Sequence, residues 1–292
     1  MSGPRVAVLR NRRLPRFVTW EIPDVDALHD DDHRLLAELA ARGADVSWVP
    51  WDEPLDWDAF DVAVLRSTWD YIDSPGAFLG ALDRIEASSC RLLNPLAAVR
   101  WNATKTYLAD LAELGVRTVP TVPAAQASGL LADGSGEVVL KPLLGAGAAG
   151  VRRVVAGDLD AVLDAERRAG TLDGLIAQPF IASVQREGEW SFVHVDGELQ
   201  HVLRKRPASG DYRAHGIYGG TLEAVHPGED DRRCVDDLLG RVPFDVAYSR
   251  VDLLRLDGRL AVLELELIEP ILYLHLAPAG AARLADAVLA RA

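Results

Sequence analysis

Three acidic side chains lie close together in two strand-like segments near the end of the chain. Asp252 belongs to the first segment, and Glu264 and Glu266 belong to the second, after a turn at Asp257-Gly258. Because side chains alternate across a strand, Glu264 and Glu266 point to one face, and pairing about the turn brings Asp252 almost directly opposite Glu264. Carboxylates crowded on one sheet face repel one another unless they share a cation. The spacing therefore predicts a divalent-metal site, with a solvated acidic strand face as the alternative.

A glycine-rich loop is the second candidate for chemistry. Lys141 ends an apolar run, and Gly145, Gly147 and Gly150 follow before the next strand-like segment at 151–155. Small residues let backbone N–H groups approach phosphate oxygens, and the lysine adds a positive charge. The loop lacks the Lys-Ser or Lys-Thr of a P-loop, and a strand rather than a helix follows it, which argues against a dinucleotide fingerprint. A flexible hairpin of small residues explains the loop equally well.

The first hundred residues alternate between strand and helix patterns. Apolar runs at 6–9, 44–49 and 61–65 suit buried parallel strands, and apolar residues at helical spacing follow at 33–42 and after Pro75. This succession predicts a small parallel sheet with right-handed crossovers.

Polar residues follow the third predicted strand, at the sheet edge where ligands of α/β proteins gather. Arg66, Thr68 and Asp70 lie there and are candidates for substrate contacts. A local ion pair between Arg66 and Asp70 is the structural alternative. The acidic run at 30–32 precedes the first predicted helix, and we interpret it as a solvated helix N-terminus rather than a metal site.

Charge and hydropathy argue against two classes of partner. A formal net charge of −13 over 292 residues is unsuited to a nucleic-acid-binding surface, which needs clustered Lys and Arg. No apolar run approaches the roughly 20 residues that span a bilayer. Cys90 and Cys234 have no partner cysteines or histidine pattern, so we expect free, buried thiols in a reducing cytosol. We therefore expect a cytoplasmic enzyme that binds neither nucleic acid nor membranes.

The order of these motifs along the chain resembles that of the ATP-grasp superfamily. Lys105 comes first, then Lys141 with the glycine-rich loop, a strand and connector at 175–181, an acidic residue at Glu189, and a basic run at 204–206 before the acidic segments. The resemblance covers about residues 94–275 and is greatest to the glutathione synthetase branch. Finer details, such as Asn94-Pro95, Trp101-Asn102, the run 66–71, Tyr218-Gly-Gly220 and the run 264–270, resemble the ATP-grasp proteins of cycloserine biosynthesis.

The resemblance implies a role for each candidate residue. It implies phosphate binding by Lys105, Lys141, Gly145, Gly147 and Gly150, adenine recognition by Gln178, Phe180 and Ile181, and ribose binding by Glu189. It implies catalysis by Lys205 and Arg213, and binding of one or two Mg²⁺ or Mn²⁺ ions by Asp252, Glu264 and Glu266. It also implies substrate binding by Arg66, Thr68, Asp70, Arg250 and Glu269. For Glu269 we propose a substrate ammonium, with a plain loop carboxylate as the equal alternative.

Two positions depart from glutathione synthetases. Glu266 stands where those enzymes usually have Asn, and Glu is still a competent Mg²⁺ ligand. Ser191 stands where they carry an arginine, two positions after the ribose-binding acid. We therefore do not interpret the chain as a glutathione synthetase.

The resemblance also implies a fold and an activity. The fold class is α/β (α+β), with a parallel N-terminal domain at 1–95 and two ATP-grasp subdomains at 96–180 and 181–292 that clasp ATP. The activity is ATP- and Mg²⁺-dependent activation of a small, amino-acid-like carboxylate through an acyl phosphate, followed by attack of a nitrogen nucleophile. In antibiotic biosynthesis this closes O-ureido-D-serine into a ring. An intermolecular amino-acid or peptide ligase and a non-catalytic ATP-binding protein are the alternatives. The sequence does not decide whether the chain forms a homo-oligomer.

Overall fold

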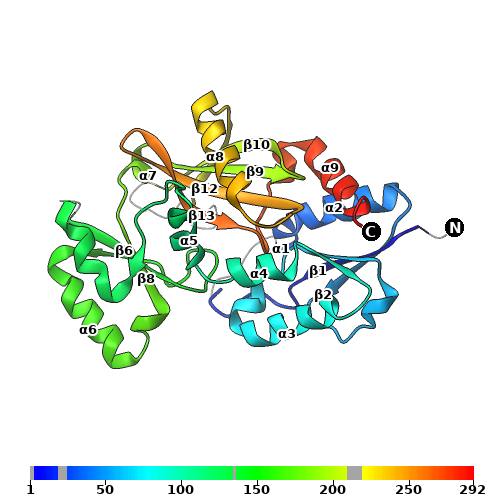
Figure 1. Cartoon of the computed structure of the whole chain (residues 1–292), viewed down its shortest axis with the longest axis horizontal. Helices are drawn as coiled ribbons and strands as arrows, with labels where there is room; N and C mark the ends of the chain where they lie inside the picture. Colours follow the sequence, from blue (N-terminus) through cyan, green and yellow to red (C-terminus); the bar gives the residue numbers. More distant parts are fainter. Residues whose placement is uncertain (1–2, 19–24, 134–135, 209–218) are drawn as a thin grey trace.

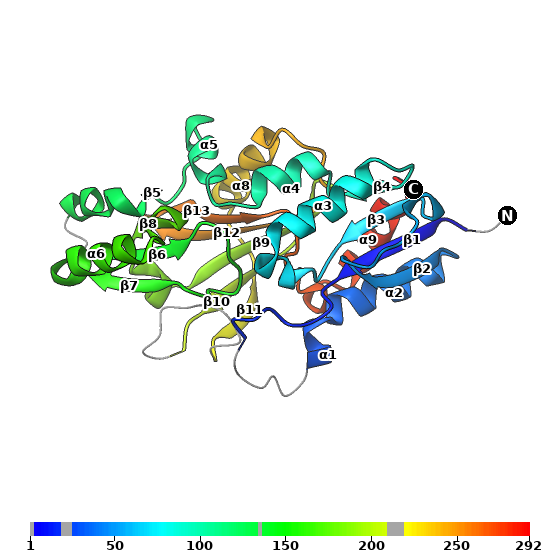
Figure 2. The same ribbon diagram turned by 90° about the horizontal axis from the view of Figure 1, so that it is seen from below.

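A computed structural model describes residues 3–18, 25–133, 136–208 and 219–292. Within them the chain forms three sheets, arranged in a row along the long axis of the molecule (Figures 1 and 2). The central sheet lies between a small sheet with α6 at one end and the N-terminal sheet at the other. No helix in the described residues is long and apolar enough to cross a bilayer.

The N-terminal sheet is entirely parallel and has the order β2-β1-β3-β4. Its strands are β1 (Arg5–Arg10), β2 (Asp45–Pro50), β3 (Val62–Leu65) and β4 (Arg91–Leu93), and its helices are α1 (Val25–Leu28), α2 (Asp30–Ala41), α3 (Pro75–Glu86) and α4 (Leu96–Asn102), with short 3₁₀ turns at η1 (Trp57–Ala59) and η2 (Trp69–Asp73). The predicted parallel sheet is confirmed.

Both faces of this sheet are buried, which explains why its strands are continuous apolar runs. Val6 and Val8 of β1 pack in one cluster with Leu35 and Leu39 of α2 and with the C-terminal helix α9 (Pro278–Leu289). Ala7 and Leu9 point to the other face, where they pack with α3 and α4. The last helix of the chain therefore helps to cover the first sheet.

The small antiparallel sheet has the order β5-β8-β6-β7. Its elements are β5 (Val122–Pro123), η3 (Ala124–Asp133), β6 (Glu137–Pro142), β7 (Arg152–Val155), η4 (Ala156–Asp158), α6 (Leu159–Ala169), η5 (Leu172–Gly174) and β8 (Leu175–Pro179). Its core joins Val138 and Leu140 of β6 to Leu159 and Leu163 of α6. The glycine-rich loop connects β6 to β7, as the sequence predicts.

The central antiparallel sheet has the order β11-β10-β9-β12-β13. Its elements and those around it are α5 (Tyr107–Glu113), α7 (Ser183–Arg186), β9 (Glu189–Val195), β10 (Glu198–Arg206), β11 (Thr221–Val225), α8 (Glu229–Arg241), β12 (Tyr248–Leu256), β13 (Arg259–Glu266) and η7 (Leu274–Leu276). Apolar residues of α4, α5 and α8 pack on one face of this sheet, in a cluster that includes Tyr107 and Phe192. The division into three domains stays a prediction.

The interpretation of the acidic run at 30–32 as a solvated helix N-terminus is wrong for two of its three residues. The helix does begin at Asp30, but Asp31 and Asp32 are only 5% and 2% exposed. The carboxylate of Asp31 accepts hydrogen bonds from the backbone N–H groups of Leu272, Tyr273 and Leu274, at 2.6, 3.0 and 2.7 Å. The run therefore binds the C-terminal part of the chain to the N-terminal sheet.

Among the residues that the structure describes, no strand pairs with the segment between β13 and η7, so buried side chains satisfy its backbone polar groups. Asn102 accepts from Leu267 N–H and donates to Leu265 C=O, both at 2.8 Å. Asn94 donates to Leu267 C=O at 2.8 Å, and Tyr248 donates to Ile268 C=O at 2.9 Å. The strand with Glu264 and Glu266 is therefore anchored directly to α4 and to the N-terminal sheet.

We expect Asp31→Ala to reduce the free energy of unfolding by at least about 3 kcal/mol, because three buried N–H groups lose their acceptor at about 1–3 kcal/mol each. Urea unfolding at pH 7 measures the difference. Asp30→Ala is the matched control, since Asp30 makes a half-exposed pair with Arg34, worth about 0.5 kcal/mol, and lies 4.0 Å from the half-exposed His275. Equal losses for the two variants would contradict this account of Asp31.

Candidate functional site

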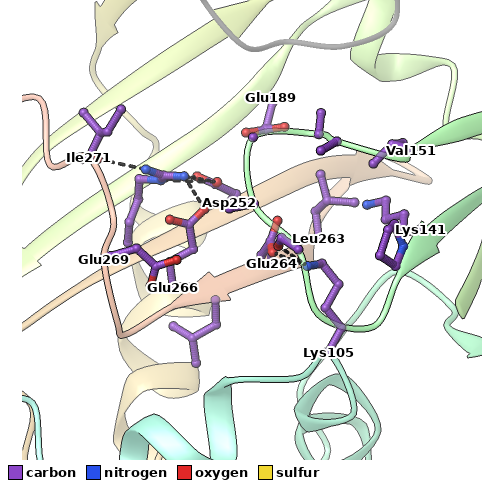
Figure 3. Close-up of a pocket in the computed structure, with 18 of the residues that line it drawn as sticks. Lys105, Lys141, Val151, Glu189, Asp252, Leu263, Glu264, Glu266, Glu269 and Ile271 are labelled. Atoms are coloured by element: carbon purple, nitrogen blue, oxygen red, sulfur yellow. Dashed lines mark hydrogen bonds and ion pairs between the residues drawn. The ribbon is translucent and has the colours of Figure 1, made fainter. Parts of the chain in front are cut away.

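One pocket collects most of the predicted site residues from separate parts of the chain. Figure 3 shows the acidic and basic side chains converging from β12, β13 and the loops beside them. The predicted residues that line the pocket are Lys105, Lys141, Gly145, Gly147, Gln178, Phe180, Ile181, Glu189, Lys205, Arg250, Asp252, Glu264, Glu266 and Glu269. Both antiparallel sheets and the loop at 14–18 contribute to the lining.

Four predicted residues do not line this pocket, and one cannot be placed. Gly150 follows the lining part of the glycine-rich loop, and Arg66, Thr68 and Asp70 are buried behind it. Arg213 lies outside the described residues.

The ion pair between Arg66 and Asp70, the structural alternative to a substrate role, is not the arrangement observed. Arg66 lies 3.9 and 3.7 Å from Asp31 and Asp32 and donates to Pro270 C=O at 3.0 Å. Asp70 accepts from Trp51 Nε1 at 2.6 Å and from the backbone N–H of Arg12 at 3.2 Å. Both residues thus hold loops in place, and Asp70 anchors the β1–α1 loop.

Strand register brings the carboxylates together as the sequence predicts. Asp252 pairs with Glu264 across β12 and β13, and Arg250 pairs with Glu266. On the other side of β12, Asp252 pairs with Ser191 of β9, and Lys205 of β10 pairs with Glu189. Alternation places this set on one face of the central sheet.

Asp252 is the centre of a buried ion network. Lys205 Nζ lies 3.2 Å from both of its carboxylate oxygens, Arg250 Nη2 lies 3.0 Å away, and Ser191 donates at 2.5 Å. Burial opposes ionisation, but Arg250 and Lys205 outweigh it and hold the pKa of Asp252 well below its usual range. Burial likewise opposes the charge of Lys205, yet Asp252 and Glu189 raise its pKa. The network is charged at neutral pH.

Two lysines flank Glu264 at the other end of the carboxylate row. Lys105 Nζ lies 3.1 Å from Glu264 Oε1 and donates to Gly145 C=O at 3.0 Å. Burial disfavours the charged form of Glu264, but Lys105 and Lys141 lower its pKa. Burial and the nearby Lys105 lower the pKa of Lys141, which has no carboxylate within 4 Å among the described residues. Lys141 is thus a half-buried cation in the pocket wall, available to an anionic ligand.

Glu266 and Glu269 have raised pKa values, in contrast to Asp252 and Glu264, whose pKa values are lowered. Burial, with Asp252 and Glu264 nearby, raises the pKa of Glu266 to about 7 although Arg250 pairs with it. Burial and Glu266 raise the pKa of Glu269 to about 8. Burial is the main cause of both shifts and neighbouring carboxylates add to it, so a bound cation would favour the charged form of each acid.

The residues present fit a hard cation, although no preformed cage exists. The described residues contain no group of three or more His, Cys, Asp or Glu side chains arranged to hold a metal ion. Asp252 is occupied by basic side chains, whereas Glu264 and Glu266 each have a single basic partner. Carboxylate oxygens are the ligands that Mg²⁺ prefers. Glu264 and Glu266 are therefore the side chains best suited to bind the metal ion.

Gln178 of β8 and the two residues after Pro179 form another part of the pocket lining. Gln178 is 1% exposed, and its Nε2 donates to Thr121 at 2.9 Å. Its Oε1 is buried without a hydrogen-bond partner, which is costly unless a ligand supplies a donor. Phe180 and Ile181 lie beside it, and the Arg153 guanidinium stacks 3.7 Å from the Phe180 ring centre.

The loops that follow β1 and β3 lie at the expected sheet edge, but sequence reasoning gave no role to several of their residues that line the pocket. Leu14 and Phe17 line the pocket, and Phe17 packs so close to Gly147 that a Cβ there would lie 3.4 Å from its ring. Trp69 and Tyr71 also line it. They belong to the run 66–71, in which only Arg66, Thr68 and Asp70 were predicted as site residues. No pattern marks the loop at 14–18, because only the folded chain brings it to the glycine-rich loop.

Two known families match consecutive parts of the chain. Residues 6–94 match the N-terminal domain of D-cycloserine synthetase DcsG, and residues 104–242 match the ATP-grasp domain of prokaryotic glutathione synthetase. The cycloserine biosynthesis protein DcsG of Streptomyces lavendulae is 32% identical over 276 residues, which cover 88% of this chain and 92% of that protein. The chain belongs to the ATP-grasp superfamily, in the family of DcsG.

Other relatives and solved structures agree with this assignment. The glutathione synthetase of Parasynechococcus marenigrum (strain WH8102) is 32% identical over 196 residues, 65% of this chain and 57% of that enzyme. The crystal structure of D-cycloserine synthetase DcsG superposes with a TM-score of 0.82 at 28% identity, covering 98% of this chain and 99% of that one. D-alanine–D-alanine ligase from Bacillus anthracis, solved with ATP, shares the fold, with a TM-score of 0.67 at 15% identity and 99% and 97% coverage.

The family membership confirms the predicted superfamily, branch and fold class. Like its relatives, this ATP-grasp protein is an ADP-forming carbon–nitrogen ligase, of a superfamily that uses ATP and Mg²⁺.

We expect Lys205→Met to lower the free energy of unfolding by about 3–5 kcal/mol, because it leaves the buried Asp252 and Glu189 short of a cation. Adding Asp252→Asn should restore part of the loss, since the two residues are coupled. Urea unfolding measures both effects. Arg204→Met is the control, because Arg204 pairs with the half-exposed Glu223 and contacts Trp190 rather than the buried acids. Additive losses in the double variant would contradict the network.

Proposed function

We propose that this ligase transfers the γ-phosphoryl group of ATP to a substrate carboxylate and then joins the acyl group to a nitrogen nucleophile. One observation carries the proposal. Four basic side chains, Lys105, Lys141, Lys205 and Arg250, converge with the acidic strand pair in a single pocket, whose lining also includes Gln178 with its unpaired Oε1. Such a pocket can hold a polyphosphate and neutralise charge that moves between two oxygen acceptors.

Each part of the nucleotide has a counterpart in the pocket. The free Oε1 of Gln178 would accept a hydrogen bond from the exocyclic amine of adenine, between Phe180 and Ile181. Glu189 would bind the ribose hydroxyls. Lys105, Lys141 and the N–H groups around Gly145 and Gly147 would bind the phosphates, and the positive φ of Gly147, +61°, turns the loop in a way that glycine favours.

Glu264 and Glu266, with Asp252 across the strand pair, would hold Mg²⁺. When bound, the cation would offset the negative charge of the phosphate oxygens. Lys205 and Arg250 are already fixed by Asp252 and Glu266. They would therefore face the developing charge without having to reorganise.

The acyl phosphate route requires no covalent protein nucleophile. Both cysteines are free, and neither lines the pocket. Burial also raises the pKa of the Cys90 thiol to about 12, so its thiolate is scarce at neutral pH. The protein would contribute positioning, charge neutralisation and protection of the acyl phosphate from water.

For the substrate we propose an amino-acid-like carboxylate that closes into a ring, as the name of D-cycloserine synthetase implies for that relative. The similarity to that enzyme extends over nearly the whole chain, including the N-terminal sheet and its loops. Ligation of two separate amino acids is the alternative within the same chemistry. Turnover with one substrate and no added amine favours the ring.

We expect ADP formation when the protein is incubated with ATP, Mg²⁺ and a suitable member of a panel of D- and L-amino acids that includes O-ureido-D-serine. A coupled ADP assay measures it, and chelation of Mg²⁺ should abolish it. Glu264→Gln should lower the rate by at least about 100-fold, because several kcal/mol of charge stabilisation are lost. Glu113→Gln, on the exposed end of α5, is the matched control. Full activity of Glu264→Gln would refute the metal assignment.

We expect Gln178→Leu to raise KM for ATP roughly tenfold, the value of one buried hydrogen bond. Inosine triphosphate lacks the exocyclic amine, so the wild type should prefer ATP and the variant should lose most of that preference. Steady-state kinetics with both nucleotides measure the ratio, and Gln126→Leu, on an exposed part of η3, is the control. An unchanged preference in Gln178→Leu would exclude this adenine contact.

A further inference from the structure

The chain that follows β1, residues 11–18, forms one wall of the pocket. The residues of this loop that line the pocket are apolar, namely Leu14, Pro15, Phe17 and Val18. Its exposed residues are Arg12, Arg13 and Arg16. In Figure 2 the dark blue chain beyond β1 leaves the N-terminal sheet and runs toward the middle of the molecule. The loop therefore places apolar side chains from the N-terminal sheet in the same lining as the glycine-rich loop.

Two carboxylates of η2 fix the backbone of the loop at 11–18. Asp70 accepts hydrogen bonds from the N–H groups of Arg12 and Arg13, at 3.2 and 3.4 Å. Asp73 accepts one from the N–H group of Arg16 at 3.0 Å. Asp70 is buried, and the side chain of Asp73 is only 11% exposed. Because carboxylates with so little access to water need their donors, these bonds hold the loop against the N-terminal sheet.

Phe17, which this loop carries, packs against the middle of the glycine-rich loop. A Cβ added to Gly147 would lie 3.4 and 3.5 Å from ring carbons Cζ and Cε2 of Phe17. These are ordinary van der Waals distances, so the ring lies directly against the glycine backbone. The segment 145–150 consists entirely of glycine and alanine, which supply little side-chain surface and leave the backbone many conformations. An aromatic ring held from outside therefore limits the conformations of this loop.

The position of the glycine-rich loop matters because the acyl phosphate proposed above reacts with water. That reaction breaks the bond between the acyl group and the phosphate, returns the carboxylate, and releases inorganic phosphate and a proton. An ordered water molecule needs two or more polar partners. The N-terminal sheet and its loops contribute mainly apolar side chains to the lining, among them Leu28 and Trp69 besides the loop at 11–18. This side of the pocket is therefore suited to exclude water.

We propose that Phe17 is a positioning residue, which fixes the glycine-rich loop over the bound phosphates and closes this side of the pocket to water. The proposal rests on the function proposed above and adds the residue that protects the intermediate. Phe17 acts through the backbone at Gly147 and does not take part in the chemistry. The loop at 11–18, held by Asp70 and Asp73, thereby connects the N-terminal sheet to the nucleotide site.

The test measures how much ADP forms for each molecule of amino acid consumed. The probe is the amino acid that gives the highest ADP formation in the panel, and mass spectrometry follows its consumption. Hydrolysis of the acyl phosphate returns the amino acid, so it raises this ratio. Phe17→Ala should raise the ratio at least about threefold over wild type, because water then reaches the intermediate. Phe17→Leu should stay close to wild type, since it keeps an apolar side chain beside Gly147.

A second measurement traps the intermediate itself. Hydroxylamine displaces phosphate from an acyl phosphate through its nitrogen and leaves a hydroxamate. Phe17→Ala should give more hydroxamate per ADP than wild type, because a small nucleophile enters the opened pocket.

Two further variants separate the role of Phe17 from general loosening of the N-terminal sheet. Asp73→Ala removes an anchor of the loop without changing the pocket lining, so it should raise the ratio in the same direction but by less. Phe60→Ala is the matched control, because Phe60 is also a half-buried phenylalanine, and it packs on Trp57 outside the pocket. Its ratio should equal that of wild type.

An unchanged ratio in Phe17→Ala overturns the proposal, as does an equal rise in Phe60→Ala. Circular dichroism checks that each variant is folded. If Phe17→Ala does not fold, Asp73→Ala decides, and an unchanged ratio there overturns the proposal. Turnover by wild type together with a normal ratio in the variants refutes only the role of Phe17, whereas no ADP formation by wild type with any carboxylate refutes the proposed function as well.

Discussion

The structure depends on how the chain leaves strand β13. Beyond Glu266 it has no neighbouring strand, so its backbone polar groups would be buried without partners. Asn94, Asn102 and Tyr248 supply those partners, and the carboxylate of Asp31 accepts three successive N–H groups. These contacts tie the acidic strand to the N-terminal sheet. The pocket exists because residues about 240 positions apart are held in one rigid arrangement.

Charge balance is the second constraint. The pocket contains five of the predicted acidic residues, Glu189, Asp252, Glu264, Glu266 and Glu269, against four basic ones, Lys105, Lys141, Lys205 and Arg250. Opposite charges are not evenly mixed, because Lys205 and Arg250 surround Asp252, whereas among the described residues no lysine or arginine lies within 4 Å of Glu269. The lysine end suits phosphates, and the acidic end suits cations. A nucleotide and an amino acid would therefore enter with complementary orientations.

Much of the site could be predicted because it depends on local rules. Strand alternation and the Asp257-Gly258 turn correctly placed Asp252 opposite Glu264. The predictions that were wrong concern residues whose partners lie far away in the sequence. Asp31 lies on the first turn of a helix and looks solvated, but the C-terminal segment buries it. Arg66 and Asp70 are close in sequence, yet each bonds to a different distant loop.

The sequence by itself determined the order of the motifs, the strand pairing of the acidic hairpin and the family to which the chain belongs, because hydrophobic periodicity, turns and motif spacing are properties of short segments. Tertiary structure alone decided which charges meet. A carboxylate acquires its role from the cations within a few ångströms, since burial makes a charge without such a partner costly. Asp252 in the middle of β12 and Glu269 after β13 both line the pocket, but folding surrounds the first with basic side chains, whereas no lysine or arginine of the described residues lies within 4 Å of the second.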